Sequence, residues 1–190
     1  MPRVPAWKRI CDWAATICLA FAFVLVFEAE VAKPYRIPSS SMEPTLHCAR
    51  PGPWCEARFS DRVIVNRLAY LFDAPKRGQV VVFKSPPAAS VQCGEGGTFV
   101  KRLIGLPGDT VSEHGGAISV NGKRLNEPYA SNTKDDNVTG TWHVPVGDYF
   151  FMGDDRSHSC DSRTWGSVPR KNLIGPLLVT YWPPNRLSVH

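Results

Sequence analysis

An uncharged, apolar run near the N-terminus, over residues 13–27, divides this chain into two unequal parts. With the apolar residues that flank it the run extends over 10–32, about 23 residues, and a helix of that length rises roughly 34 Å. The hydrocarbon core of a bilayer is about 30 Å thick. The pattern therefore predicts a transmembrane helix over 10–32, a cytoplasmic N-terminus over 1–9 and an extracytoplasmic domain over 33–190.

The charges beside this run indicate its orientation. Three basic residues precede it and two follow it closely, and an excess of basic residues marks the cytoplasmic side of a membrane. The alternative is a cleaved secretory signal, with the small residues of Ala20-Phe21-Ala22 at the cut. Both interpretations place the chain from Pro34 onward outside the cytoplasm.

Length and charge limit the remaining possibilities. The chain has 190 residues, which suits one globular domain plus an anchor, and its 22 basic and 17 acidic side chains give a net charge of +5. Such a charge is compatible with nucleic acid or with an anionic membrane surface. The basic residues are scattered and no nucleic-acid motif occurs, so we expect membrane lipid as a partner and no nucleic acid.

Beyond the apolar run the sequence reads as strands and turns, which predicts a mainly β fold. The candidate strands are rich in Val, Ile, Phe and Tyr and lie at residues 62–68, 79–83, 98–104, 117–120, 123–125, 149–152 and 177–182. Asn121-Gly122 is a hairpin signal, and residues 68–72 are either the end of a strand or a short helical turn. Residues from about 109 to 148 form an insertion, which predicts a small inserted hairpin lobe.

Polar segments separate these strands. Residues 34–41 contain two prolines and a serine run, which predicts an extended linker after the apolar helix. Residues 86–97 and 127–140 are rich in Gly, Pro, Ser, Asn and charge, and we expect both to be surface loops.

Four of the six cysteines lie in the part predicted to be exported. In an oxidising compartment, Cys48, Cys55, Cys93 and Cys160 allow three pairings. The turn-rich segment between Cys48 and Cys55 favours pairing those two, which leaves Cys93 with Cys160; free thiols are the alternative. No C-x-x-C spacing occurs, so we expect no metal, and nothing in the pattern requires an organic cofactor.

Three segments carry groups suited to chemistry. Residues 39–45 read Ser-Ser-Ser-Met-Glu-Pro-Thr, residues 99–109 read Phe-Val-Lys-Arg-Leu-Ile-Gly-Leu-Pro-Gly-Asp, and residues 153–163 read Gly-Asp-Asp-Arg-Ser-His-Ser-Cys-Asp-Ser-Arg. A serine that attacks a carbonyl needs a group to take its proton, and a lysine without its charge can do so. These segments, in this order and over nearly the whole chain, resemble the bacterial type I signal peptidases.

The resemblance implies a signal-peptidase-like β fold and a membrane-bound serine endopeptidase that removes signal peptides from exported preproteins. It implies Ser41 as nucleophile, Lys101 as general base, and the Ser39 hydroxyl with the Ser41 amide as the oxyanion hole. Burial would lower the pKa of Lys101 toward about 7 to 8, which leaves a neutral amine to accept the proton. It also implies small residues at the first and third substrate positions before the cut.

The third segment resembles the family's support for the dyad. There Ser159 matches the serine that hydrogen-bonds the lysine, and Asp161 and Arg163 match a structural ion pair, which we expect on an extended segment. Asp154 belongs to the same cluster. The sequence departs from the common pattern at Asp155, where asparagine is usual, and at Cys160, where alanine often lies.

Other interpretations use different residues or none. His158 lies in the third segment and would be the base of a Ser/His/Asp triad. A peptidase dedicated to one substrate, such as a pilin, and an inactive β-domain that binds peptides or the translocation machinery are further alternatives. Proximity of Ser41 to Lys101, with Ser159 beside the amine, would favour the enzyme.

Overall fold

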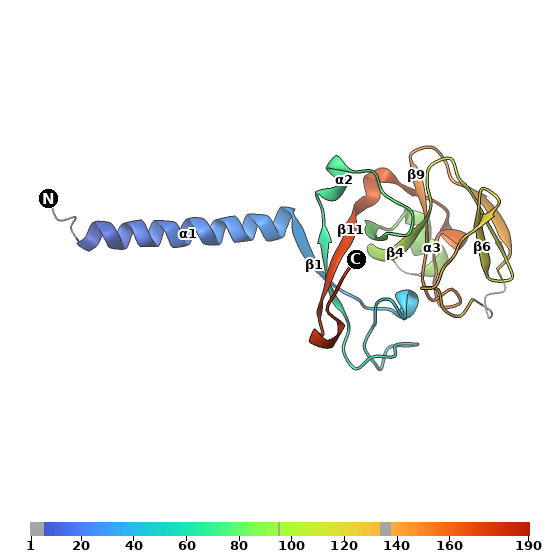
Figure 1. The fold of residues 1–190 in the computed structure, drawn as a ribbon, viewed down its shortest axis with the longest axis horizontal. Coiled ribbons are helices and arrows are strands. Elements are labelled where there is room, and N and C mark those ends of the chain that lie inside the picture. The colour runs from blue at the N-terminus through green and yellow to red at the C-terminus, as the bar shows by residue number, and fades with distance from the viewer. Residues whose placement is uncertain (1–5, 95, 134–137) are drawn as a thin grey trace.

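The computed structural model describes residues 6–94, 96–133 and 138–190. Helix α1 (Ala6–Glu30) extends away from a β domain that contains the rest of the chain, and it meets that domain at strand β1 (Ala32–Arg36) (Figure 1). The helix expected near the N-terminus is therefore present, and the part of the chain after it is mainly β, as predicted.

The membrane span predicted over 10–32 is not supported. Within the described part of the chain, no helix is both long enough and apolar enough to cross a membrane. Asp12 and Glu28 bound the uncharged run over 13–27, which would rise only about 22 Å as a helix.

The domain is built on an antiparallel sheet that spans most of the sequence. Its order is β1, β2, β11, β3, β4, β9 and β10, with β12 beside β11. Besides β1, the strands are β2 (Arg62–Asn66), β3 (Val80–Lys84), β4 (Thr98–Gly105), β9 (Asp148–Met152), β10 (Val168–Pro169), β11 (Leu173–Trp182) and β12 (Ser188–Val189). The central strands are buried because they pack apolar side chains on both faces, so β3 reads Val-Val-Val-Phe.

A second, four-stranded sheet comes from the segment between β4 and β9. Its order is β7 (Lys123–Arg124), β6 (Ala117–Val120), β5 (Thr110–His114) and β8 (Gly140–His143). The turn between β6 and β7 has positive φ at Asn121 (52°) and Gly122 (76°), as a two-residue hairpin turn of this type requires. Ile118 of this sheet and Phe150 of the main sheet lie in one apolar cluster, which joins the two.

Short helices complete the fold and correct two expectations. They are η1 (Ser40–Met42), α2 (Ala69–Phe72), α3 (Pro87–Cys93), α4 (Ser162–Trp165), η2 (Arg170–Asn172) and η3 (Pro184–Arg186). Residues 86–97 were expected as a loop but contain α3, which has Pro87 in its first turn and ends at Gly94 with φ 68°. Residues 34–41 were expected as an extended linker, but residues 34–36 belong to β1, where Pro34 is tolerated because β1 is an edge strand, and η1 begins at Ser40.

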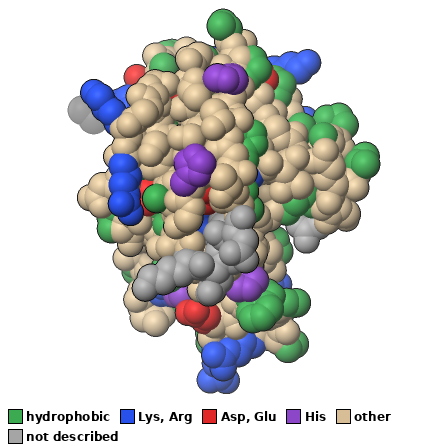
Figure 2. Space-filling view, turned by 90° about the vertical axis from the view of Figure 1, so that its right-hand side faces the viewer, with side chains coloured by type: hydrophobic (Ala, Val, Ile, Leu, Met, Phe, Trp, Pro, Cys, Tyr) green, Lys and Arg blue, Asp and Glu red, His purple; other side chains and the backbone are tan. Residues whose placement is uncertain are grey.

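Charge is dispersed on the face of the domain turned away from α1. Figure 2 shows this face, on which the Lys and Arg side chains in view lie apart from one another near its edges.

Candidate active site

Ser41 lies in the middle of helix η1, at the surface of the main sheet. Its side chain is nearly buried, and Met42 after it is completely buried in the apolar cluster that also holds Leu46. The amide of Asp155 donates a hydrogen bond to the carbonyl of Ser41 (3.2 Å). The serine backbone is therefore held from both sides, by apolar packing after it and by the third sequence segment beside it.

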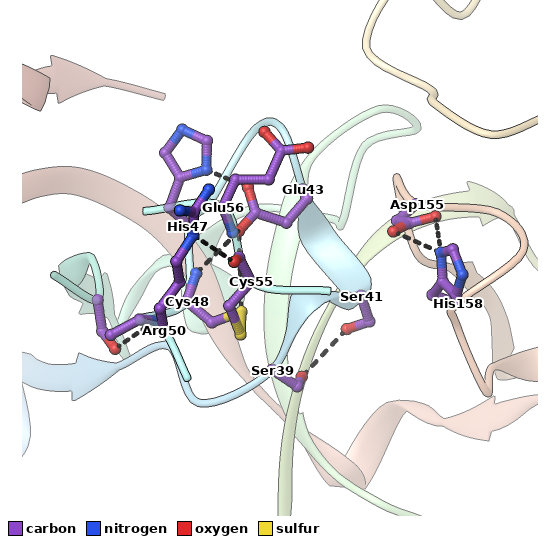
Figure 3. Close-up of a disulfide and its surroundings, with 12 residues drawn as sticks. Ser39, Ser41, Glu43, His47, Cys48, Arg50, Cys55, Glu56, Asp155 and His158 are labelled. Carbon is purple, nitrogen blue, oxygen red and sulfur yellow. Dashed lines mark hydrogen bonds and ion pairs between the residues drawn. A yellow bond between two sulfur atoms is a disulfide. The ribbon is translucent and has the colours of Figure 1, made fainter. Parts of the chain in front are cut away.

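The Ser39 hydroxyl lies next to that of Ser41. Their Oγ atoms are 3.4 Å apart and point toward each other (Figure 3). The two hydroxyls that the sequence singled out are thus neighbours at the start of η1, in the geometry of a weak hydrogen bond.

Lys101 lies in β4 and opens onto the same cavity as Ser41. It is 5% exposed and pairs in register with Val81 of β3. The cavity measures about 610 Å³, and its lining includes residues 38–41 and residues 98–101. A nearly buried hydroxyl and a nearly buried amine therefore share one solvent-accessible space.

Gly153 allows Ser159 to lie close to the backbone of Ser41. A Cβ atom at Gly153 would collide with the Ser159 side chain and with the carbonyl oxygen of Ser41, so the two segments approach this closely only because residue 153 has no side chain. Ser159 Oγ is buried and, with Trp165 Nε1, is one of two such side-chain atoms in the described residues without a hydrogen-bond partner. Its hydroxyl is thus free to bond a group at the site.

Asp161 and Arg163 form a buried ion pair. Arg163 Nε lies 2.9 Å from Asp161 Oδ1, and the amide of Gly153 donates to Asp161 Oδ2 (3.1 Å). We had expected this segment to be extended, and that expectation is wrong, because residues 162–165 form helix α4. Asp161 is the N-cap of α4, accepting a hydrogen bond from the amide of Arg163, because an aspartate at this position satisfies a free helical amide.

The charges around Asp161 lower its pKa. Burial by itself would raise the pKa of this carboxyl, but the charge and hydrogen bonds of Arg163, the charge of Lys101 and the amide of Gly153 outweigh burial and bring it below its ordinary value. Lys101 therefore lies within electrostatic reach of an ionised aspartate, a neighbour that sequence reasoning did not assign to it.

Asp154 has a different partner. Its carboxylate is completely buried and binds Arg102 in a two-pronged ion pair, with Nε at 2.7 Å and Nη2 at 2.5 Å. Tyr129 lies over the Arg102 guanidinium, 3.8 Å from ring centroid to Cζ. The side chains of Lys101 and Arg102 point to opposite faces of β4, since they are consecutive in the strand. Asp154 therefore binds the face that carries Arg102 and is not a partner of the Asp161–Arg163 pair.

Two disulfides border the cavity. Cys48 pairs with Cys55, and Cys93 of α3 pairs with Cys160, while Cys11 and Cys18 of α1 are free and exposed. Three of the paired cysteines line the cavity, at positions 55, 93 and 160. Because Cys160 follows Ser159 directly, the second disulfide ties the Ser159 segment to α3.

His158 belongs to a cluster that the sequence did not reveal. Its Nδ1 lies 3.0 Å from both carboxylate oxygens of Asp155 (Figure 3), and its ring stacks on Trp54, 4.2 Å between centroids. The contact with Asp155 is one that a triad would use to orient its histidine base. The stacking on Trp54 gives the same ring a packing role as well. No signal in the sequence joins position 54 to position 158.

Glu43, His47 and Glu56 offer metal-ligand atoms within 4.8 Å of one another. In the structure, however, the buried Glu43 carboxylate accepts the amides of Cys48 (3.1 Å) and Glu56 (3.5 Å) and contacts the His47 ring. Its oxygens thereby brace the loop that follows the serine, and we assign this cluster a structural role.

A nearly buried serine and a nearly buried lysine on one cavity of a β scaffold are the arrangement of a serine hydrolase with an amine base. A scan of family models matches residues 10–182 to the signal peptidases of peptidase family S26. The chain belongs to this family. It is a serine endopeptidase that removes signal peptides.

The names of curated relatives support this family assignment. Signal peptidase I of Leptolyngbya laminosa is 39% identical over 91% of this chain and 80% of its own length. The probable signal peptidase I-1 of a Synechocystis strain is 35% identical over 97% of this chain and 89% of its own. Signal peptidase I of Mycobacterium tuberculosis is 32% identical over 99% and 78%. An inactive peptide-binding domain and a pilin-dedicated peptidase are not favoured.

Proposed function

We propose that this signal peptidase works through a Ser41–Lys101 dyad. The observation that carries the proposal is the shared cavity, in which both side chains are less than a tenth exposed. The Lys101 amine takes the Ser41 proton as Oγ bonds to the scissile carbonyl carbon. The protonated amine then gives its proton to the departing amine of the mature protein, which leaves an acyl-enzyme.

Deacylation repeats the sequence with water as nucleophile. Lys101 takes a proton from the water as it attacks the ester carbonyl, and returns it to Ser41 Oγ as the signal peptide leaves. In both steps the backbone amide of Ser41 and the hydroxyl of Ser39 stabilise the oxyanion. Ser159 Oγ, buried beside Gly153, positions the Lys101 amine, and the Asp161–Arg163 pair holds the Ser159 segment in place.

The substrate binds as an added strand. One edge of β4 pairs with β3 over residues 98–102, and β9 pairs with the opposite edge at Arg102, Leu103 and Gly105. Residues 98–101 also line the cavity. An extended signal peptide between residues 98–101 and residues 38–41 would pair with β4 on the β9 side, with small side chains at the first and third positions before the cut.

Helix α1 attaches the enzyme to lipid. Its large apolar side chains are open to solvent, with Trp13 70%, Leu19 74% and Phe21 65% exposed, and such a surface favours contact with a membrane. In this proposal the domain over 33–190 acts on the extracytoplasmic side, where exported preproteins emerge from the translocation machinery. Liposome flotation tests the attachment: Leu19→Asp with Phe21→Asp should release the protein, whereas Phe72→Asp in α2 should not.

The dyad is tested with a preprotein substrate in detergent. Ser41→Ala and Lys101→Met should each abolish cleavage, because one removes the nucleophile and the other removes the base. Ser188→Ala and Lys171→Met are matched controls, since both positions are exposed and lie outside the cavity lining. Cleavage by either dyad variant at the wild-type rate would refute the proposed mechanism.

A further inference from the structure

Trp54 is an exposed aromatic residue held in an unfavourable backbone conformation. Its side chain is 67% exposed, and its φ of 61° lies in the left-handed region, which a bulky residue rarely adopts. The Cys48–Cys55 disulfide closes the short loop that carries it. Exposed apolar surface and backbone strain both cost stability, and strain of this kind is found where a side chain is held for a function.

A contact from a distant segment fixes the orientation of the Trp54 ring. The His158 ring covers one face of the indole, with the ring planes inclined at 24°. His158 is held by Asp155, and the amide of Asp155 donates to the carbonyl of Ser41. The position of the indole is thereby tied to that of the proposed nucleophile through consecutive contacts.

The Trp54 ring borders the space in which the reaction takes place. Trp54, Pro53 and His158 line the same cavity as Ser41 and Lys101. The lining of this cavity also includes one cysteine of the first disulfide and both cysteines of the second, at positions 55, 93 and 160. A substrate side chain that lies against Trp54 would therefore meet an aromatic ring in a cavity that has further apolar atoms in its lining.

We propose that Trp54, supported by His158, is a specificity-determining residue that packs against an apolar side chain of the preprotein near the scissile bond. The inference rests on the proposed function and adds a subsite to it. This subsite is distinct from those for the small residues before the cut, since a wide aromatic surface gains most from a large apolar partner. The strained loop and its disulfide hold the ring in place before substrate arrives, which reduces the entropy lost on binding.

The test uses the full chain in detergent and a set of preprotein-derived peptides. In this set, each position within five residues of the cut is leucine in one peptide and aspartate in its pair. For wild type, kcat/KM should favour leucine at one position outside the small-residue sites. Trp54→Ala should raise KM about tenfold for the leucine peptide at that position, leave kcat within about twofold, and remove the preference there alone.

Two variants make the outcome decisive. Phe59→Ala is the matched control, since Phe59 is 50% exposed, follows the same disulfide loop and lies outside the cavity lining. Trp54→Phe keeps an aromatic surface and should retain most of the preference, which guards against a folding defect in the alanine variant. An unchanged leucine preference in Trp54→Ala, with its melting temperature intact, would overturn the inference, as would equal effects of Trp54→Ala and Phe59→Ala.

The same set of peptides distinguishes failure of the subsite proposal from failure of the dyad proposal. If Ser41→Ala abolishes cleavage of every peptide while Trp54→Ala behaves as wild type, the dyad stands and the subsite is wrong. If Ser41→Ala still cleaves the peptides, the proposed function fails whatever the Trp54 variants do.

Discussion

Arg163 Nη1 lies 3.4 Å from both carboxylate oxygens of Glu113, and this contact joins the segment beside Ser159 to strand β5 of the second sheet. Glu113 is completely buried, and Arg163 also binds Asp161 and donates to the carbonyl of Arg156 (2.7 Å). One guanidinium therefore connects the second sheet, helix α4 and the loop around the proposed site. The second sheet is in this way part of the support for the active site.

Glu113→Gln should weaken this support. The amide keeps the shape of the side chain but removes the charge that faces Arg163, and the loss of a hydrogen bond to a charged group costs about 2 kcal/mol. We expect that decrease in the free energy of unfolding, measured with urea, together with a lower kcat. Glu127 also binds a buried arginine, Arg156, so an equal loss of kcat in Glu127→Gln would show that the effect is one of general stability.

Asp161→Asn should destabilise the protein in a pH-dependent way. Removal of one partner of a buried ion pair costs about 3 kcal/mol or more. Because the folded pKa of Asp161 is below its ordinary value, its contribution is fully present above that ordinary value, about 3.9, and is lost as the pH falls through the lowered pKa. Urea unfolding of wild type and variant should differ at pH 7 and converge in strong acid; a constant difference would contradict the assignment.

Lys101 should give the cleavage rate its dependence on pH. If the neutral amine is the base, kcat/KM falls as the pH is lowered and Lys101 gains its proton. Lys101→Arg should be inactive at every pH, because arginine stays protonated and cannot accept the Ser41 proton. His158→Asn separates this mechanism from a triad. It should keep the acid limb of the profile, whereas disappearance of that limb in His158→Asn would favour histidine as base.

Gly153→Ala should impair catalysis out of proportion to its size. The added methyl group has no space between the Ser41 carbonyl and the Ser159 side chain, so one of those segments must move. Overpacking of this kind costs about 1 to 3 kcal/mol, and the displacement should lower kcat. Gly147→Ala is a useful contrast, because a Cβ there meets nothing within 4 Å and its φ of 86° alone causes strain. Equal kcat values for the two variants would contradict the close approach.

The two disulfides should differ in their effect on stability. Cys93 and Cys160 are 67 positions apart, whereas Cys48 and Cys55 are 7 apart, and the chain-entropy model gives about 4 and about 2 kcal/mol for loops of these lengths. Replacing both members of a pair by serine and measuring thermal unfolding tests the order. A larger loss from the shorter loop would contradict it.

Much of the site was predictable because its residues lie in short, contiguous segments. Ser41 and Lys101 were predicted from the resemblance of the segments that contain them to a known family, and the structure places both on one cavity. The turn-rich segment between Cys48 and Cys55 predicted the pairing of those two cysteines, which the structure confirms. The strands with strong apolar patterns, such as β3 and β4, lie close to where the sequence placed them. Strands β5 and β8 were missed, since they are short, carry polar residues and exist through pairing with β6 and with each other.

By itself, the sequence determined the residues with reactive groups, their order along the chain and the mainly β character of the domain, since these depend on local composition and spacing. Only the tertiary structure decided which groups meet. It paired Asp154 with Arg102 instead of with the Asp161 cluster, brought Glu113 to Arg163 across 50 positions, and stacked Trp54 on His158. Such contacts depend on strand register and on the close approach at Gly153, which are properties of the packed chain and of no single segment.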